Sequence, residues 1–411
     1  MSIQLLPNET NGAKIKVVGV GGGGGNIVNS MVDKGIDGVE FIAINTDLQA
    51  LEKSKADVKI QIGKSITKGL GTGMKNDVGE KSAEESREEI ARALAGSDMI
   101  FITAGMGGGT GTGASPVVAH VAKSIDALVV AIVTKPFIFE AEPRMIMAEQ
   151  GIDKLKREVD SLIVIPNQRI VELMPRDCTK DQAFSMANKV LYSATKGISQ
   201  IITKTGEINV DFADVRSTMK STGEAMIGTG VATGEDRAIR AVEEALSNPI
   251  LEDINIDGAK NVLVNIASNG NIGMQEIASI NEAVIERAGE KANFIFGVLD
   301  DTDLDEEIMV TVIATGFRKE EIEVPNNNDL TFKVAEGYDL GNIGRITALP
   351  KDLNELQGLE APAFIRRYKD FKINDDLSES IKPYLDTRNK NLGFKDPNPI
   401  DSPAFLRRSL D

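Results

Sequence analysis

The nine residues GMGGGTGTG, Gly105–Gly113, follow the apolar run MIFITA and precede the helical pattern ASPVVAHVAKSI. Glycine loses more conformational freedom on folding than any other residue, so a cluster of glycines needs a physical reason. A turn between a strand and a helix supplies one, because it lets the N–H groups at the start of the helix approach a phosphate. The hydroxyls of Thr110 and Thr112 can add donors. The stretch therefore predicts a phosphate-binding turn after a buried strand.

A second glycine-rich turn, GVGGGGGN at Gly19–Asn26, follows the strand pattern KIKVVG and precedes the helical pattern NIVNSMVDKG. It fits the dinucleotide-binding pattern G-x-G-x-x-G through Gly19, Gly21 and Gly24. Asp47, at the end of VEFIAINTD, stands where such folds place the carboxylate that binds a ribose hydroxyl. A nicotinamide-dependent oxidoreductase is therefore one hypothesis.

Two such turns in one sheet favour a different ligand, because a dinucleotide-binding domain normally needs only one for its pyrophosphate. A chain of phosphates held from two sides by backbone N–H groups would use both. The sequence contains no GxxxxGK[ST] pattern, so it has no Walker P-loop and no P-loop lysine.

The pattern on either side of these turns predicts the fold class. Strand and helix patterns alternate over residues 14–178, which predicts an α/β fold with a Rossmann-like parallel sheet covered on both faces. Residues 179–206 predict one long connecting helix, and residues 207–318 a second, mixed-sheet α/β domain. Residues 1–13 and 319–411 are polar and weakly periodic, so we expect a flexible arm and a flexible tail.

Two local expectations concern helix boundaries. The glycine clusters are interpreted as turns, with helices that begin at Asn26 and Ala114. The charged stretch SAEESREEIARALAG, residues 82–96, is interpreted as a single amphipathic helix that stops at Gly96.

Composition excludes several kinds of chemistry. The net charge of −16 argues against a general nucleic-acid binder, which needs a basic surface. Cys178 and His120 are the single cysteine and histidine of the chain, so an internal disulfide and a His-rich or thiolate metal site are excluded. We interpret His120 as a helix residue at or near the surface. Carboxylates, amides and backbone donors are left to carry any chemistry.

The sequence carries no targeting signal that we recognise. No window approaches the roughly 18 continuous apolar residues of a membrane span, and the first residues lack the features of a signal peptide. We expect a cytoplasmic protein without a membrane anchor of its own.

One short pattern occurs twice in the tail, as APAFIRRYKD at 361–370 and SPAFLRRSLD at 402–411. An apolar trio followed by two arginines in a flexible segment is typical of a docking peptide. The anchors of the terminal copy would be Phe405, Leu406, Arg407 and Arg408.

Seven motifs together resemble the FtsZ family of bacterial tubulin homologues in order and spacing: GVGGGGGN, NTD, GLGTG, GMGGGTGTGASPVVA, VTKPFIFE, IPN and GEINVDFADV. The resemblance runs from about Lys14 to Phe317 and resumes in the last ten residues. It implies a tubulin-like fold that binds GTP or GDP at the carboxyl edge of its sheet and hydrolyses GTP. It also implies head-to-tail filaments that form the division ring at mid-cell, and recruitment to the inner membrane by an adaptor that binds the terminal peptide.

The resemblance also assigns roles around the nucleotide. The two glycine turns would hold the phosphates, the loop Gly69–Gly73 would sense the γ-phosphate, and Glu140 and Arg144 would bind around the ribose. Two asparagines would read the guanine and a phenylalanine would stack on it. The GTP-binding residues implied are Gly22, Gly23, Gly24, Gly25, Asn26, Asn45, Asp47, Gly71, Thr72, Gly73, Gly107, Gly108, Gly109, Thr110, Gly111, Thr112, Glu140, Arg144, Asn167, Phe184 and Asn188.

Simpler interpretations exist for some of these residues, and two positions depart from the family pattern. Glu140 and Arg144 are four apart and fit a surface helix pair, and Asn188 fits a solvated helix residue. Ala141 replaces the glycine usual after FE, and Lys189 stands where the family often has Asp or Asn.

By the same resemblance, Asp211 and Asp214 would orient the attacking water, with help from Asn209, and Mg²⁺ would be held mainly through the phosphates. These residues would enter the nucleotide site of the next subunit, so that hydrolysis depends on assembly. An acidic surface turn is the simpler interpretation of these carboxylates. A non-catalytic scaffold is a third hypothesis, although the intact NVDFADV disfavours it.

Overall fold

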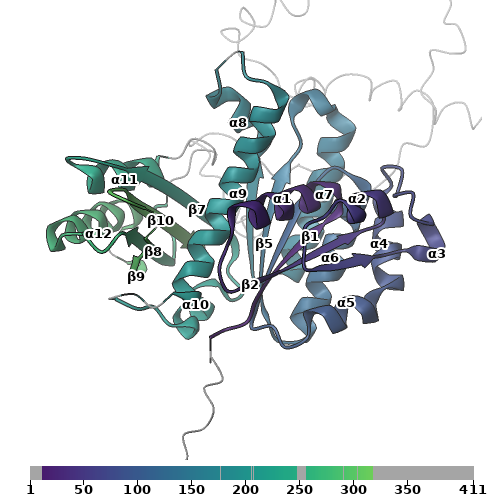
Figure 1. Ribbon diagram of the computed structural model, residues 1–411, viewed down its shortest axis with the longest axis horizontal. Helices are drawn as coiled ribbons and strands as arrows, with labels where there is room; N and C mark the ends of the chain where they lie inside the picture. The colour runs from purple at the N-terminus through teal and green to yellow at the C-terminus, as the bar shows by residue number, and fades with distance from the viewer. Residues whose placement is uncertain are drawn as a thin grey trace, which may run out of the picture. The chain divides into compact units, whose positions relative to one another are not determined.

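The computed structural model describes residues 12–317 except 176, 205, 207, 248–255, 290 and 303 (Figure 1). Both copies of the tail peptide, with Phe405, Leu406, Arg407 and Arg408, lie outside the described residues. Within this part of the chain one sheet has the strand order β3-β2-β1-β4-β5-β6-β7-β10-β8-β9. Its strands are β1 (Ile15–Val20), β2 (Val39–Asn45), β3 (Val58–Gln61), β4 (Met99–Gly105), β5 (Leu128–Lys135), β6 (Ser161–Pro166), β7 (Gly223–Ala232), β8 (Asn261–Ser268), β9 (Asn293–Asp300) and β10 (Ile308–Thr315).

Helices join these strands, and none in the described part of the chain is long and apolar enough to cross a bilayer. They are α1 (Gly21–Lys34), α2 (Leu48–Glu52), α3 (Lys64–Thr67), α4 (Asn76–Glu85), α5 (Arg87–Leu94), α6 (Gly109–Ser124), the 3₁₀ turn η1 (Ile138–Glu140), α7 (Glu142–Glu158), α8 (Asn167–Leu173), α9 (Lys180–Thr203), α10 (Phe212–Met219), α11 (Arg237–Leu246) and α12 (Met274–Ala288).

The first six strands form a parallel sheet that is covered on both faces. Neighbours β1, β2, β4, β5 and β6 pair in parallel along most of their length. Buried side chains of α1 and α9 fill one core, and those of α5, α6 and α7 fill the core on the opposite face. Burial on both faces explains why the strand sequences are continuous apolar runs. The covered parallel sheet confirms the predicted α/β fold.

The remaining strands form the mixed sheet that was predicted. β7 and β8 each pair antiparallel with β10, and β9 pairs parallel with β8. Helices α11 and α12 contribute to the core of this region. β7 joins the parallel sheet through only two residue pairs, Ser161 with Gly223 and Leu162 with Glu224. Buried side chains of α9 pack in one core with residues of both halves, such as Ile163 and Leu263, and so add to this connection.

Helix α9 has 24 residues and is about 36 Å long. It begins with a capping box, in which Thr179 Oγ1 accepts the N–H of Gln182 and Gln182 accepts the N–H of Thr179 at 2.8 Å. Its apolar face contacts both halves of the molecule through Leu191, Ile198 and Ile201. Figure 1 shows α8 near one end of α9 and α10 near the other.

A buried carboxylate fixes the second half of α9 to the mixed sheet. Asp301, 1 % exposed, accepts a hydrogen bond from Gln200 at 2.8 Å and one from Lys204 at 3.1 Å, with Lys196 at 3.4 Å. Burial raises the pKa of this carboxyl, but the hydrogen bonds from Gln200 and Lys204 and the two ammonium charges outweigh burial and lower the pKa to about 2. Asp301 therefore remains ionised at neutral pH and keeps its ion pairs with the two lysines.

Both expectations about helix boundaries were wrong. Residues 82–96 form two helices, α4 and α5, which are interrupted at Ser86. Helices α1 and α6 begin at Gly21 and Gly109 instead of at Asn26 and Ala114. Most glycines of the two clusters therefore lie in helical first turns, where free N–H groups point along the helix axis.

Candidate functional site

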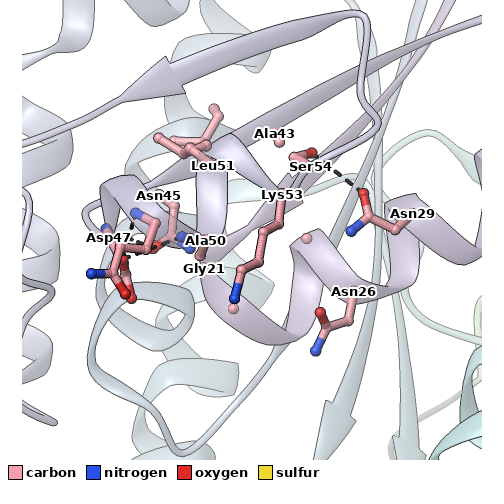
Figure 2. A pocket seen from close by; sticks show the side chains of 14 residues that line it. Gly21, Asn26, Asn29, Ala43, Asn45, Asp47, Ala50, Leu51, Lys53 and Ser54 are labelled. Carbon is pink, nitrogen blue, oxygen red and sulfur yellow. Dashed lines mark hydrogen bonds between the residues drawn. The ribbon is translucent and has the colours of Figure 1, made fainter.

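Two cavities open at the carboxyl edge of the parallel strands, on either side of the first turns of α1. The α9-side cavity, ≈ 330 Å³, lies between α1, the loop after β4 and α9. The α2-side cavity, ≈ 300 Å³, lies between α1, the end of β2 and α2 (Figure 2). Asn26 lines both. The predicted site residues that line the first are Gly23, Asn26, Gly108, Glu140, Arg144, Asn167, Phe184 and Asn188, and those that line the second are Gly22, Gly25, Asn26, Asn45 and Asp47.

Several glycines of the clusters are required by the fold itself. A β-carbon on Gly24 would overlap the carbonyl oxygen of Thr103, and one on Gly111 would lie 2.7 Å from the carbonyl oxygen of Gly105. A β-carbon on Gly109 would overlap the hydroxyl of Thr72. These glycines let α1 and α6 pack backbone to backbone with the strands and with the loop before α4.

Gly22, Gly25 and Gly108 have no such role. A β-carbon at each would meet no atom within 4 Å, and none of the three has a positive φ. Each lines one of the two cavities. The fold would accept alanine at these positions, so we attribute their glycines to the close approach of a ligand.

Thr110 and Thr112 bond within the protein instead of lining either cavity. The Thr110 hydroxyl lies 2.8 Å from the hydroxyl of Thr46, and Thr112 Oγ1 accepts the N–H of Gly107 at 2.9 Å. Both side chains are buried. In this structure the Thr112 hydroxyl therefore holds the loop after β4, and the Thr110 hydroxyl joins α6 to the loop after β2.

Glu140 and Arg144 form an ion pair at the wall of the α9-side cavity. Glu140 also accepts the N–H of Phe137 at 3.0 Å, and Arg144 Nη2 lies 3.8 Å from the sulfur of Met74. Ala141, between them, has φ 77° and ψ 153°, a conformation that suits glycine and costs other residues about 1–3 kcal/mol. Ala141, which replaces the glycine of the family pattern, therefore keeps the turn but in a strained backbone conformation.

The other end of the α9-side cavity suits a planar base. Phe184, 48 % exposed, packs edge-on against Phe137 with ring centroids 5.2 Å apart. Asn188 lies one turn further along α9, and Asn167 begins α8. Asn167 is buried and its carboxamide oxygen has no hydrogen-bond partner in the structure. An acceptor without a partner fits the N–H groups on the edge of guanine.

The described residues that line the α2-side cavity do not include the loop Gly69–Gly73, which contacts α2 through its first residue. Asp47 Oδ1 accepts the N–H of Gln49 at 2.9 Å and caps α2, while Leu48 N–H donates to the carbonyl oxygen of Gly69 at 3.1 Å. Gly71 and Gly73 have positive φ. The polar side chains at this cavity that no motif identifies are those of Asn29, Gln49, Lys53 and Ser54.

The three residues expected to act on water lie far from both cavities. Asp211 caps α10, accepting the N–H of Asp214 at 2.9 Å, and both aspartates and Asn209 are exposed. The following strand β7 begins beside Ser161, the first residue of β6. This segment therefore lies at the amino edge of the sheet, whereas both cavities lie at its carboxyl edge.

His120 has the simple role predicted for it. It is about half exposed and its Nδ1 lies 2.9 Å from Glu158 Oε2. Among the described residues, no three His, Cys, Asp or Glu side chains gather as metal ligands.

Comparison with known proteins identifies relatives across almost the whole chain. Residues 14–175 match the GTPase domain of the Tubulin/FtsZ family, and residues 223–318 match the C-terminal domain of the FtsZ family. The chain is 44% identical over 399 residues to the cell division protein FtsZ of Buchnera aphidicola subsp. Baizongia pistaciae, covering 97% of each. It is 43% identical to that of Coxiella burnetii, covering 98% of each. An empty FtsZ dimer from M. jannaschii is similar in structure, with a TM-score of 0.71, 44% identity and coverage of 76% of this chain and 93% of that one.

Proposed function

The chain belongs to the FtsZ family, and we propose that this GTPase completes its active site between two subunits stacked head to tail. It is a cell-division protein that binds guanine nucleotide and forms filaments. The predicted family, tubulin-like fold and GTPase activity are thereby confirmed. The comparisons give no support to a nicotinamide-dependent oxidoreductase.

The observation that carries the proposal is the separation of the two halves of the site. Phe184 and Asn188 line the nucleotide cavity from the first turns of α9, while Asp211 and Asp214 follow the end of the same helix. From Asn188 to its end at Thr203 the helix is about 23 Å long, and the segment after it lies at the opposite edge of the sheet, so these carboxylates would not reach a nucleotide bound by their own subunit. A neighbouring subunit can supply them when its amino edge meets this carboxyl edge.

We infer that guanine binds against Phe184 and that the phosphates extend along the first turn of α1 toward Asp47. This direction follows from the two cavities, which meet at Asn26. The N–H groups that begin α1 and α6 would hold phosphate oxygens. Mg²⁺ would be held mainly by those oxygens and would neutralise their charge.

In the completed site, the neighbour's Asp211 and Asp214 would orient a water molecule toward the γ-phosphorus, with Asn209 assisting. The water oxygen forms the new P–O bond while the bond to the β-phosphate oxygen breaks, giving GDP and phosphate. Phosphoryl transfer depends on positioning and charge stabilisation, which carboxylates and backbone donors can supply. Loss of the γ-phosphate from the interface would weaken the contact between subunits.

GTP turnover per chain is expected to rise with protein concentration, because each active site needs two subunits. The measurement is phosphate release across about a hundredfold range of protein concentration, with light scattering recorded in parallel to follow assembly. Turnover should level off once scattering shows that assembly is complete. A turnover per chain that stays constant down to concentrations without assembly would contradict the proposal.

We propose further that residues 402–411 bind a membrane-tethering adaptor that brings the filament to the inner membrane at mid-cell. The support is the repeated apolar-plus-arginine pattern in the tail. In cells, a chain that lacks residues 402–411 is expected to assemble and hydrolyse GTP normally but to lose its place at mid-cell. Normal mid-cell rings from the shortened chain would contradict this role.

A further inference from the structure

We propose that Lys53 binds the terminal phosphate of GTP and makes this chain prefer GTP over GDP. This inference rests on the proposed placement of the nucleotide. The sequence has no P-loop lysine, so the cation that such a lysine would supply has to come from elsewhere. The α2-side cavity contains a candidate that no motif marks.

The first observation is the position of Lys53. It caps the C-terminal end of α2, and among the described residues that line the α2-side cavity it is the only cation. Figure 2 shows its side chain extending from α2 so that the ammonium lies, in that view, between Gly21 and Asn26. Gly21 opens the first turn of α1, whose free N–H groups attract phosphate, and Asn26 lies in the following turn.

The second observation is the set of groups around the ammonium. Among the described residues that line this cavity, Asp47 is the only carboxylate, and its Oδ1 already accepts the N–H groups of Gln49 and Ala50. In the described part of the chain no ion pair holds the Lys53 ammonium. Its neighbour Lys55, in contrast, pairs with Asp33 at 2.7 Å. The charge of Lys53 is therefore available for an anion in the cavity.

The third observation is the shape of the cavity. Gly22 and Gly25 lie along the face of α1 that lines it, and nothing in the fold fills the space a side chain would take there. The loop Gly69–Gly73 bonds to the other, N-terminal end of α2, through Leu48 N–H and the carbonyl oxygen of Gly69. The Lys53 side chain and the glycines of α1 thus line one open space that can receive a phosphate.

In the proposed placement of the nucleotide, only the triphosphate extends into the α2-side cavity as far as Lys53. An ammonium–phosphate contact without a competing carboxylate contributes strongly to binding, because both partners are charged. We therefore expect Lys53→Met to weaken the binding of a triphosphate about tenfold and the binding of GDP by less than about threefold. Lys53→Arg retains the charge and should recover most of the lost affinity.

The test measures binding of GDP and of a GTP analogue with a non-hydrolysable β–γ bridge, in the presence of Mg²⁺ and below the concentration at which scattering reports assembly. Lys55→Met is the matched control, because it removes a neighbouring lysine whose partner lies outside the cavity. Equal triphosphate affinity in Lys53→Met and Lys55→Met would overturn the inference, and so would an equal loss for GDP and the triphosphate. If the unaltered chain bound no guanine nucleotide, the proposed function itself would fail.

Discussion

Replacing Asp214 by alanine is expected to lower GTP turnover at least about a hundredfold while it leaves GTP affinity nearly unchanged. The exposed Asp214 takes part in the cap of α10 through its backbone N–H, which the substitution retains. Its carboxylate lies at the edge of the sheet opposite the cavities, so binding within one subunit should not depend on it. The measurement is steady-state phosphate release together with nucleotide binding.

Substitutions of Asp211 can separate the effect of its negative charge on turnover from its effect on the stability of the fold. Its side chain caps α10 by accepting the Asp214 N–H, and alanine at such a position costs about 1 kcal/mol of stability. Asparagine caps helices equally well, so Asp211→Asn should remain stable and lose turnover. Normal turnover in either Asp214→Ala or Asp211→Asn would show that these carboxylates do not act on the water.

Gly24→Ala and Gly25→Ala are expected to differ in their effect on the free energy of unfolding, although the two glycines are adjacent. A β-carbon on Gly24 would overlap the backbone of Thr103 and lie 2.8 Å from the carbonyl carbon of Gly19, with no side chain that could move away. Gly24→Ala should therefore lower the free energy of unfolding by about 3 kcal/mol. The space around Gly25 is open, so Gly25→Ala should leave stability unchanged or raise it by up to about 1 kcal/mol.

The same pair separates structural glycines from ligand-facing ones. Gly25 lines the α2-side cavity, so Gly25→Ala should weaken GTP binding about tenfold despite its normal stability. Thermal unfolding of the nucleotide-free chains and equilibrium GTP binding are the two measurements. An equal loss of stability in both variants, or normal GTP affinity in Gly25→Ala, would contradict the assignment of these glycines.

The strands of the parallel sheet could be predicted because their burial on both faces leaves continuous apolar runs between glycine and polar punctuation. β7 could not be predicted in this way. Gly228 and Gly230 make β7 resemble a loop, and their reason lies in tertiary structure: β-carbons there would overlap the carbonyl oxygens of Ala245 and Ala241 on α11. The sequence around a glycine does not show whether another element approaches it closely in the fold.

The candidate site could be predicted only in part, again because contacts that form in the fold are not visible in the local sequence. The glycine clusters marked the carboxyl edge, but their spacing did not distinguish Gly24, which the fold requires, from Gly25, which it does not. The hydroxyls of Thr110 and Thr112 were assigned to phosphate by proximity in the sequence, whereas packing directs them to Thr46 and Gly107. Lys53 carries no motif, and only the fold brings it to the start of α1.

The central claim, that one active site is shared by two subunits, can be tested most directly by mixing two inactive variants. Asp214→Ala retains the nucleotide cavity but lacks the carboxylate. Gly108→Leu retains Asp214, but its new side chain, which meets no protein atom near its β-carbon, would fill the α9-side cavity. Each variant alone should hydrolyse GTP very slowly.

The measurement is GTP turnover of an equimolar mixture of the two variants, with co-sedimentation to verify that they assemble together. Because Gly108→Leu can place its Asp214 against the nucleotide bound by Asp214→Ala, the account predicts turnover at least about tenfold above the sum of the separate rates. A mixture that sediments together but hydrolyses GTP no faster than that sum would contradict a site shared between subunits.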